Sequence, residues 1–207
     1  SGCGKSTLLK IITGLYSKDA GDIYMDGKLV NITNVNEAQS HGIYVVPQEV
    51  QVQPNLTVAE NIFLGKLPTT KQGLVDWKKT YRIAEEVKAR LGEAGAKLNV
   101  RAKTGGMSMG NWQLIEIMRA LVADNLRVIA FDEPTSSLSD SEVELLFKLI
   151  DDLRSQGLAI VYVSHKLKEI FTICDDISIL RDGKYIGSRV VKETTADDLI
   201  SMMIGRD

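Results

Sequence analysis

SGCGKSTLLKIITGLY, residues 1–16, joins a glycine-rich loop directly to a stretch with helical spacing. Its Gly4-Lys5-Ser6-Thr7 matches the end of the phosphate-loop motif G-x-x-x-x-G-K-S/T, whose first glycine would lie two residues before Ser1. Leucines and isoleucines then recur at helical intervals up to Gly14, which we expect to end the helix. The stretch therefore predicts a phosphate-binding loop in front of a helix.

Each residue type in this loop suits phosphate. Small residues let backbone N–H groups wrap the phosphates, and the helix N-terminus favours negative charge. We expect Lys5 to reach the outer phosphates and the Ser6 hydroxyl to contact Mg²⁺. The predicted phosphate-binding residues are Gly2, Cys3, Gly4, Lys5, Ser6 and Thr7. Cys3 is expected to be a reactive thiolate that a bound nucleotide protects. A small residue that merely fits the loop is the alternative for Cys3, and a glycine turn that binds nothing is the alternative for the motif.

A second chemical segment is the apolar strand Arg127–Phe131, which runs into Asp132-Glu133. Ligands of α/β proteins bind at the carboxyl edge of the sheet, where both acids are expected to lie. Asp132 suits the shell of a Mg²⁺ ion, and Glu133 is placed to polarise an attacking water. A pair of solvated acids at the end of a strand is the alternative interpretation.

Strand and helix patterns alternate along most of the chain, which predicts an α/β fold with a mostly parallel sheet flanked by helices. Asp26-Gly27 and Asp182-Gly183 each predict a tight antiparallel hairpin. No strand pattern occurs over residues 68–123, so we expect a helical subdomain there, inserted into an α/β core of residues 1–67 and 124–207. The expected strands are 42–46, 127–131, 158–163 and 177–180, and the expected helices are 56–64, 77–91, 111–122, 141–154, 167–174 and 196–204.

Composition excludes several classes of protein. Of the 207 residues, 44% are hydrophobic and 25% charged, which is typical of a globular domain. A net charge of −2 gives no reason to expect a nucleic-acid partner. The longest apolar runs, such as Leu158–Val163, are far too short to span a bilayer, so we expect a soluble cytosolic protein. Cys3 and Cys174 are expected to be reduced thiols.

Further motifs follow in an order that resembles the ATPases of ABC transporters across nearly the whole chain. Gln48 resembles the Q-loop glutamine, and Met107-Ser108-Met109-Gly110-Asn111 resembles the signature motif L-S-G-G-Q. Asp132–Leu138 resembles the Walker B and D-loop segment, and His165 resembles the switch histidine. The resemblance implies a P-loop NTPase fold of ABC type that binds ATP and Mg²⁺ and hydrolyses ATP.

It also implies roles for single residues. Glu133, His165 and Gln48 would be catalytic, and Ser6, Gln48 and Asp132 would hold Mg²⁺. In this family two ATP-binding domains face each other head to tail, so Ser108 and Gly110 would contact the partner domain's ATP. Met107, Met109 and Asn111 depart from the family pattern. Because Asn111 is one methylene shorter than glutamine, we expect slower hydrolysis at the partner's site.

Within the family, the resemblance is greatest to the first ATPase domain of bacterial monosaccharide importers. Three segments carry it: Asn55–Gly65, Ser136–Ser139 and Ser201–Asp207. It implies that the N-terminal strands of the fold are missing from this chain. The implied partners are a second ATP-binding domain, on the same polypeptide or as a homodimer, a transmembrane permease and, indirectly, a periplasmic sugar-binding protein. The implied location is the cytoplasmic face of the inner membrane, as a peripheral protein.

Two other functions use the same motifs. One is a soluble ABC ATPase of DNA repair or translation, although neither heptads nor a basic block is present. The other is a regulatory half that binds ATP without hydrolysing it. Such a half is expected to have lost part of the catalytic set, whereas Lys5, Gln48, Asp132, Glu133 and His165 are all present.

Overall fold

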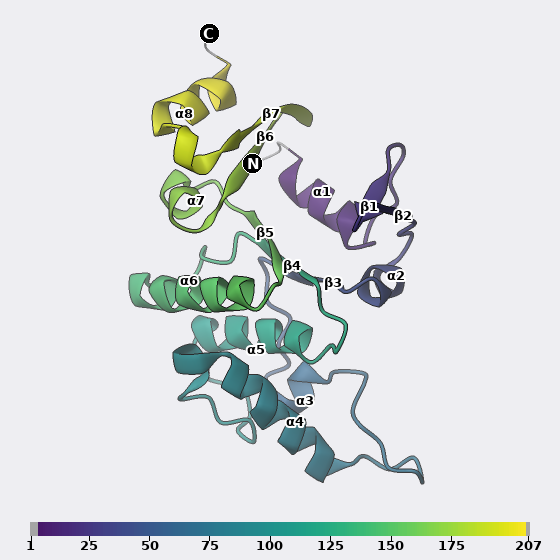
Figure 1. Cartoon of the computed structure of the whole chain (residues 1–207). Helices are drawn as coiled ribbons and strands as arrows, with labels where there is room; N and C mark the ends of the chain where they lie inside the picture. The colour runs from purple at the N-terminus through teal and green to yellow at the C-terminus, as the bar shows by residue number, and fades with distance from the viewer. Residues whose placement is uncertain (1–3, 206–207) are drawn as a thin grey trace.

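The computed structural model describes residues 4–205, which form helices around three small sheets (Figure 1). The strands are β1 (Ile23–Met25), β2 (Lys28–Val30), β3 (Ile43–Val46), β4 (Val128–Asp132), β5 (Ala159–Val163), β6 (Asp176–Arg181) and β7 (Lys184–Val190). The α-helices are α1 (Lys5–Ile12), α2 (Val35–Ser40), α3 (Val58–Ile62), α4 (Trp77–Arg90), α5 (Met109–Leu121), α6 (Asp140–Ser155), α7 (Leu167–Ile173) and α8 (Ala196–Ile204). Two 3-10 turns are η1 (Gly92–Gly95) and η2 (Val191–Glu193).

The central sheet is parallel, as the sequence predicts. Its strand order is β3-β4-β5, with Val45 opposite Ala130 and Ala130 opposite Val161. The three central residues of β4, Ile129, Ala130 and Phe131, are apolar and fully buried, which is typical of a parallel strand covered on both faces. Because the three strands are parallel, their carboxyl ends lie at one edge, and that edge carries the segments after Val46, Asp132 and Val163.

Helices cover both faces of this sheet. Side chains alternate along β4, so Ala130 packs on one face with Leu9 of α1 and Val163. Ile129 and Phe131 face the other way, into the main hydrophobic core. That core also holds buried side chains of α5 and α6, such as Ile115, Ile117, Leu149 and Leu153. The packing fixes α1, and with it the loop in front of α1, against the carboxyl end of β4.

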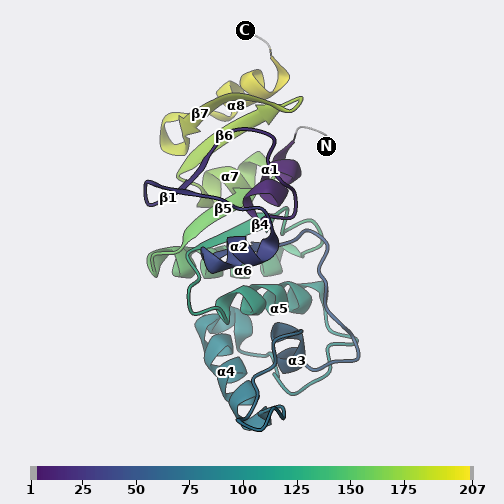
Figure 2. The same ribbon diagram turned by 90° about the vertical axis from the view of Figure 1, so that its right-hand side faces the viewer.

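A layer of helices lies beyond α6, opposite the hairpin of β6 and β7 (Figure 2). In this layer α3, α4 and α5 bury Ala59, Ala84 and Ile115 against one another. Thr57 and Glu60 form a reciprocal capping box at the start of α3, which satisfies two backbone donors of that helix. We expected residues 68–123 to form a separate subdomain, and those boundaries stay a prediction.

Two hairpins form at the predicted dipeptides. Asp26 and Gly27 have φ angles of 50° and 73°, the left-handed conformation that a two-residue hairpin loop needs. Asp182 and Gly183 repeat the geometry between β6 and β7. The Asp-Gly pairs therefore determine both turns locally.

Two features differ from the sequence-based expectation. The alternation of helices and strands favoured a place in the parallel sheet for residues 177–180. Strand β6 forms the predicted antiparallel hairpin with β7, but it pairs with no other described strand. A hollow of about 660 Å³ lies between β5 and β6. Helix α2 was not predicted. The residue before it is Asn34, whose side chain accepts a hydrogen bond from the Glu37 backbone N–H.

The helices of residues 4–205 include none that is long and apolar enough to cross a membrane.

Candidate active site

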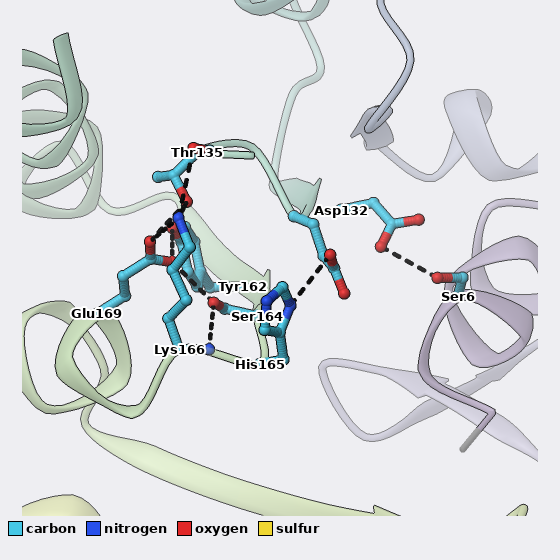
Figure 3. Close-up of polar contacts among 9 residues, drawn as sticks. Ser6, Asp132, Thr135, Tyr162, Ser164, His165, Lys166 and Glu169 are labelled. Atoms are coloured by element: carbon cyan, nitrogen blue, oxygen red, sulfur yellow. Dashed lines mark hydrogen bonds and ion pairs between the residues drawn. The ribbon is translucent and has the colours of Figure 1, made fainter. Parts of the chain in front are cut away.

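The carboxyl edge of the central sheet gathers the residues that the sequence predicts to be reactive (Figure 3). Asp132 ends β4 and Glu133 follows it directly. His165 lies two residues beyond the end of β5, and Ser6 lies in the first turn of α1. Segments far apart in the sequence therefore contribute side chains to one edge.

Ser6 and Asp132 form the first contact of this edge. The Ser6 hydroxyl donates to the Oδ1 atom of Asp132 at 3.2 Å. Burial raises the pKa of Asp132, and the neighbouring Glu133 carboxylate adds to the effect, against the hydrogen bond from Ser6 and the charges of Lys10 and Lys5. The two side chains thus place a hydroxyl and a carboxyl oxygen side by side.

This donor set fits Mg²⁺. Magnesium prefers oxygen ligands, keeps several waters, and is usually held by one or two carboxylates together with substrate phosphates. Within residues 4–205 no cluster of three or more His, Cys, Asp or Glu could hold a metal by itself. The remaining ligands would therefore be water, phosphate oxygens or an amide oxygen such as that of Gln48.

Glu133 and His165 form the second contact. The Nδ1 atom of His165 lies 3.2 Å from the Oε2 atom of Glu133, whose side chain is 13% exposed, against 58% for His165. A carboxylate can only accept, so an Nδ1–H of His165 would face it, which leaves Nε2 of the ring for another partner. Glu133 has a φ angle of 47°, a conformation that non-glycine residues rarely adopt, and its backbone N–H donates to the Val163 carbonyl at 2.9 Å.

The N-terminus of α1 lies beside this edge. Gly4 is the residue before the helix, with a φ angle of 91° that strongly favours glycine. Lys5, Ser6 and Thr7 form the first turn of the helix, whose N-terminus carries the partial positive charge of the helix dipole. Such a turn favours an anion. The predicted phosphate contacts of Gly2 and Cys3 lie outside the described residues.

Gln48 is exposed in the segment that follows β3. In the part of the chain that the structure describes, no hydrogen bond joins it to Ser6 or Asp132, so the structure does not bring it into contact with the pair. Its segment is nevertheless anchored to α5. The buried Glu116 accepts the backbone N–H of Gln51 at 2.8 Å, and Arg119 donates to the Gln51 carbonyl at 3.2 Å.

Ser108 and Gly110 lie at the start of α5. Ser108 is the residue before the helix, and its hydroxyl accepts the Asn111 backbone N–H at 3.2 Å and donates to Glu142 at 3.3 Å. A Cβ added at Gly110 would lie 2.2 Å from the same Glu142 oxygen, so glycine leaves room for that carboxylate. Met107 and Trp112 pack against the main core.

Sequence reasoning missed the charged side chains that support these loops. Glu169 is buried on α7 and accepts hydrogen bonds from Thr135, two residues after Glu133, and from Ser164, beside His165. Glu116 is buried on α5. Neither belongs to a motif with a recognisable spacing. A glutamate near a strand end or in an amphipathic helix is usually exposed, so the sequence offered no signal for their burial.

The fold and the site define a class. A phosphate-loop helix, a Ser–Asp pair suited to Mg²⁺ and a Glu–His pair at the carboxyl edge of a parallel sheet are typical of a P-loop nucleotide-binding domain. The model of the family described as "ABC transporter" matches residues 1–136. The chain belongs to this family.

Similar proteins agree with that membership. The chain is 46% identical over 207 residues to the "Ribose import ATP-binding protein RbsA" of Bacillus cereus, and 45% identical to the protein of that name from Geobacillus kaustophilus. Each match covers 100% of this chain and 41% of the relative. The chain therefore spans about 41% of the length of these curated relatives.

Solved structures support the fold. An ATP-binding cassette of an ABC transporter in its ADP conformation matches with a TM-score of 0.79 at 24% identity, over 100% of this chain and 85% of that one. A dimeric ATP-binding cassette in a post-hydrolysis state, bound to ADP and phosphate, matches with a TM-score of 0.71 at 26% identity, over 91% and 81%.

Proposed function

We propose that this chain binds ATP and hydrolyses it to energise a membrane permease that imports a monosaccharide. One observation carries the proposal: the Ser6–Asp132 contact and the Glu133–His165 contact lie together at the sheet edge, beside the N-terminus of α1. The names of the relatives, ribose import ATP-binding proteins, support the choice of a monosaccharide.

ATP would bind through its phosphates at the start of α1. The residues proposed to hold them are Gly2, Cys3, Gly4, Lys5, Ser6 and Thr7. Backbone N–H groups and the Lys5 ammonium offset the negative charge of the phosphates. Ser6, Asp132 and Gln48 would hold the Mg²⁺ ion. When bound, that ion neutralises charge on the outer phosphate oxygens.

Glu133 would position the attacking water and accept its proton. The water oxygen bonds to the γ-phosphorus, the bond from that phosphorus to the bridging oxygen breaks, and the electron pair leaves with ADP. The Nδ1 contact of His165 would hold the Glu133 carboxylate in place, which leaves Nε2 of the ring to face the γ-phosphate. Gln48, in the segment after β3, is proposed to orient the same water.

A second ATP-binding domain is the proposed partner at the nucleotide. Ser108, Gly110 and the N-terminus of α5 would contact the ATP held by that domain, and would add hydrogen-bond donors only when the two domains close. The Glu142 carboxylate now accepts from Ser108, so this bond must be exchanged for one to phosphate during closure. The dimer found for a related ATP-binding cassette supports this arrangement.

The permease is proposed to dock on a hollow of about 470 Å³ between the segment after β3, α3 and α5. Leu15 and Leu64 line this hollow and are 55% and 46% exposed. Apolar side chains at the rim of a hollow favour the insertion of a partner's side chains. Docking there would hold the chain at the cytoplasmic face of the membrane as a peripheral protein, and would link it indirectly to a periplasmic sugar-binding protein.

Nucleotide binding and hydrolysis test the proposal in the full-length polypeptide assembled with its permease. Lys5→Met removes the phosphate-facing charge, and Lys192→Met is the matched control because Lys192 is exposed on η2. We expect Lys5→Met to weaken ATP binding by roughly tenfold or more, about 1.4 kcal/mol, with Lys192→Met unchanged. Wild-type protein without affinity for ATP would contradict the proposal. Affinity for ATP with no Mg²⁺-dependent phosphate release would favour the regulatory alternative.

A further inference from the structure

A buried carboxylate that belongs to none of the motifs lies next to the candidate active site. Glu169 of α7 is 6% exposed. It accepts hydrogen bonds from the Thr135 hydroxyl at 2.5 Å, the Ser164 hydroxyl at 2.7 Å and the Tyr162 hydroxyl at 2.9 Å. The Lys166 ammonium lies 3.2 Å from it. Figure 3 shows these four groups converging on the carboxylate.

Three of the four partners of Glu169 come from two loops, and the fourth, Tyr162, lies in β5. Thr135 lies two residues after Glu133, in the turn that follows β4. Ser164 and Lys166 flank His165, in the turn that follows β5. Lys166 also joins the two loops directly, because its ammonium donates to the Thr135 hydroxyl at 3.1 Å. Glu169 therefore fastens together the two loops that carry the Glu133–His165 pair.

The carboxylate is saturated with donors. Burial raises the pKa of the Glu169 carboxyl, but the hydrogen bonds to it outweigh burial and hold the pKa below its usual range. A buried charge is tolerated only when it is paired and hydrogen-bonded in this way. Glu169 thus acts as a hydrogen-bond acceptor for the three hydroxyl groups and the ammonium that surround it.

Stabilising its own helix would be the simpler role. Glu169 lies in the first turn of α7, where a glutamate commonly accepts a backbone N–H of the helix terminus. Within the described residues, however, its bonds go to side chains of the two loops and of β5, and none goes to the backbone of α7. The bonding pattern is therefore that of a brace between loops and differs from that of a helix cap.

We propose that Glu169 is a positioning residue for ATP hydrolysis, which holds the loops after β4 and β5 so that Glu133 and His165 meet. The inference rests on the proposed function, because it assigns a role within that same site. Glu169 does not contact the Ser6–Asp132 pair or the start of α1 in the described structure. Its loss should therefore slow the chemical step and leave ATP affinity unchanged.

Glu169→Gln in the full-length polypeptide, assembled with its permease, tests the brace. Glutamine keeps the size, but its amide NH₂ cannot accept a hydroxyl hydrogen and the ion pair with Lys166 is lost. We expect kcat to fall by roughly tenfold and the KM for ATP to stay within about twofold, because only the transition state uses the aligned pair. Glu169→Asp keeps the charge and should retain more of kcat than Glu169→Gln.

Two further variants separate alignment from stability. Val87→Ala opens a cavity in α4, at a buried position in the helical layer away from the sheet edge, and should lower Tm without lowering kcat. If Glu169→Gln does not fold, Thr135→Val carries the test, because it deletes one donor to Glu169 and should also reduce kcat selectively. An unchanged kcat in a folded Glu169→Gln or Thr135→Val protein overturns the inference.

Glu133→Gln in the same assay tells the two proposals apart. If wild type hydrolyses ATP, Glu133→Gln abolishes hydrolysis and Glu169→Gln retains full kcat, the brace is wrong and the proposed function stands. If wild type releases no phosphate, the proposed hydrolysis fails, and the role of Glu169 fails with it. A loss of kcat in both variants with unchanged KM supports both proposals.

Discussion

At Glu133 the backbone adopts a left-handed conformation that costs a non-glycine residue about 1–3 kcal/mol. The cost is tolerated because the surroundings fix the residue: its N–H donates to the Val163 carbonyl, and its carboxylate lies 3.2 Å from Nδ1 of His165. This conformation turns the side chain out of the strand at the point where β4 ends. Strain retained at such a position is consistent with a catalytic role.

Cys174 is expected to be an unreactive thiol. Burial raises its pKa to about 11, and the neighbouring Asp175 carboxylate adds to the effect. At pH 8 only roughly one thiol in a thousand would be ionised, and the thiolate is the species that alkylates. We therefore predict that iodoacetamide labels Cys174 slowly in the folded protein and at a normal rate after denaturation, as mass spectrometry of the tryptic peptides would record.

Cys3 supplies the comparison. Cys3 lies outside the described residues, so its reactivity and its protection by MgATP stay predictions. Labelling of the two cysteines in one sample tests both expectations. Rapid labelling of Cys174 in folded protein would contradict the burial of its thiol. Equal labelling of Cys3 with and without MgATP would favour the interpretation that Cys3 merely fits the loop.

Single residues were predictable where a short motif carries the chemistry. Ser6, Asp132, Glu133 and His165 each lie beside a recognisable strand or loop pattern, and the structure brings them to one edge. Glu169 was not predictable, because its burial depends on Thr135 and on the residues around His165 meeting in space. No local pattern encodes such a meeting, and only the packed fold reveals it.

Among the elements, α3 depends on its cap. The Glu60 carboxylate accepts the Thr57 backbone N–H and the Thr57 hydroxyl, both at 2.7 Å. These bonds hold the pKa of Glu60 below its usual range. The carboxylate therefore stabilises the folded state at pH values above the ordinary glutamate pKa of about 4.3, and this stabilisation is lost as pH falls through the lowered value.

Glu60→Gln is expected to lower the free energy of unfolding by about 1 kcal/mol at pH 7. The difference from wild type should shrink as pH falls below the ordinary glutamate pKa of about 4.3, because wild type loses its ionised cap there while glutamine does not titrate. Thermal unfolding at several pH values measures this, with Glu144→Gln, an exposed glutamate of α6, as control. A difference that is constant with pH would show that the charge of Glu60 is not what stabilises α3.

Secondary structure was predictable from periodicity to within a few residues, and α8 has the predicted bounds, Ala196–Ile204. The separation of β6 from the parallel sheet was not predictable in this way. An Asp-Gly turn brings β7 to β6 through a two-residue loop, whereas pairing with β5 depends on what lies between the two strands. The local sequence pattern predicts where strands form, but which strands pair with each other depends on the assembled sheet.

At the scale of the whole molecule, the surface to test is the hollow of about 470 Å³ beside α3. Glu60 is a poor probe of permease docking, because any change there also removes the cap of α3. Leu64 is a better one, since it is 46% exposed at the rim of the hollow. Leu74, which is 69% exposed and does not line the hollow, is the matched control.

Leu64→Glu is predicted to weaken association with the permease by roughly tenfold, because a charge must be desolvated when the partner covers it. Leu74→Glu should leave association unchanged. Co-purification of the permease and transport of sugar into vesicles measure the effect, and the affinity for ATP, measured alongside, should not change. Full association of the Leu64→Glu protein would place the docking surface elsewhere.

The central claim is that Glu133, aligned by His165, positions the water that attacks ATP. Single-turnover release of phosphate from a preformed complex with MgATP tests it most directly, because binding is complete before the chemical step begins. Glu133→Gln is predicted to slow release by roughly tenfold or more, a loss of at least about 1.4 kcal/mol of transition-state stabilisation, with nucleotide still bound. Release at the wild-type rate would contradict the claim and make this domain a holder of nucleotide.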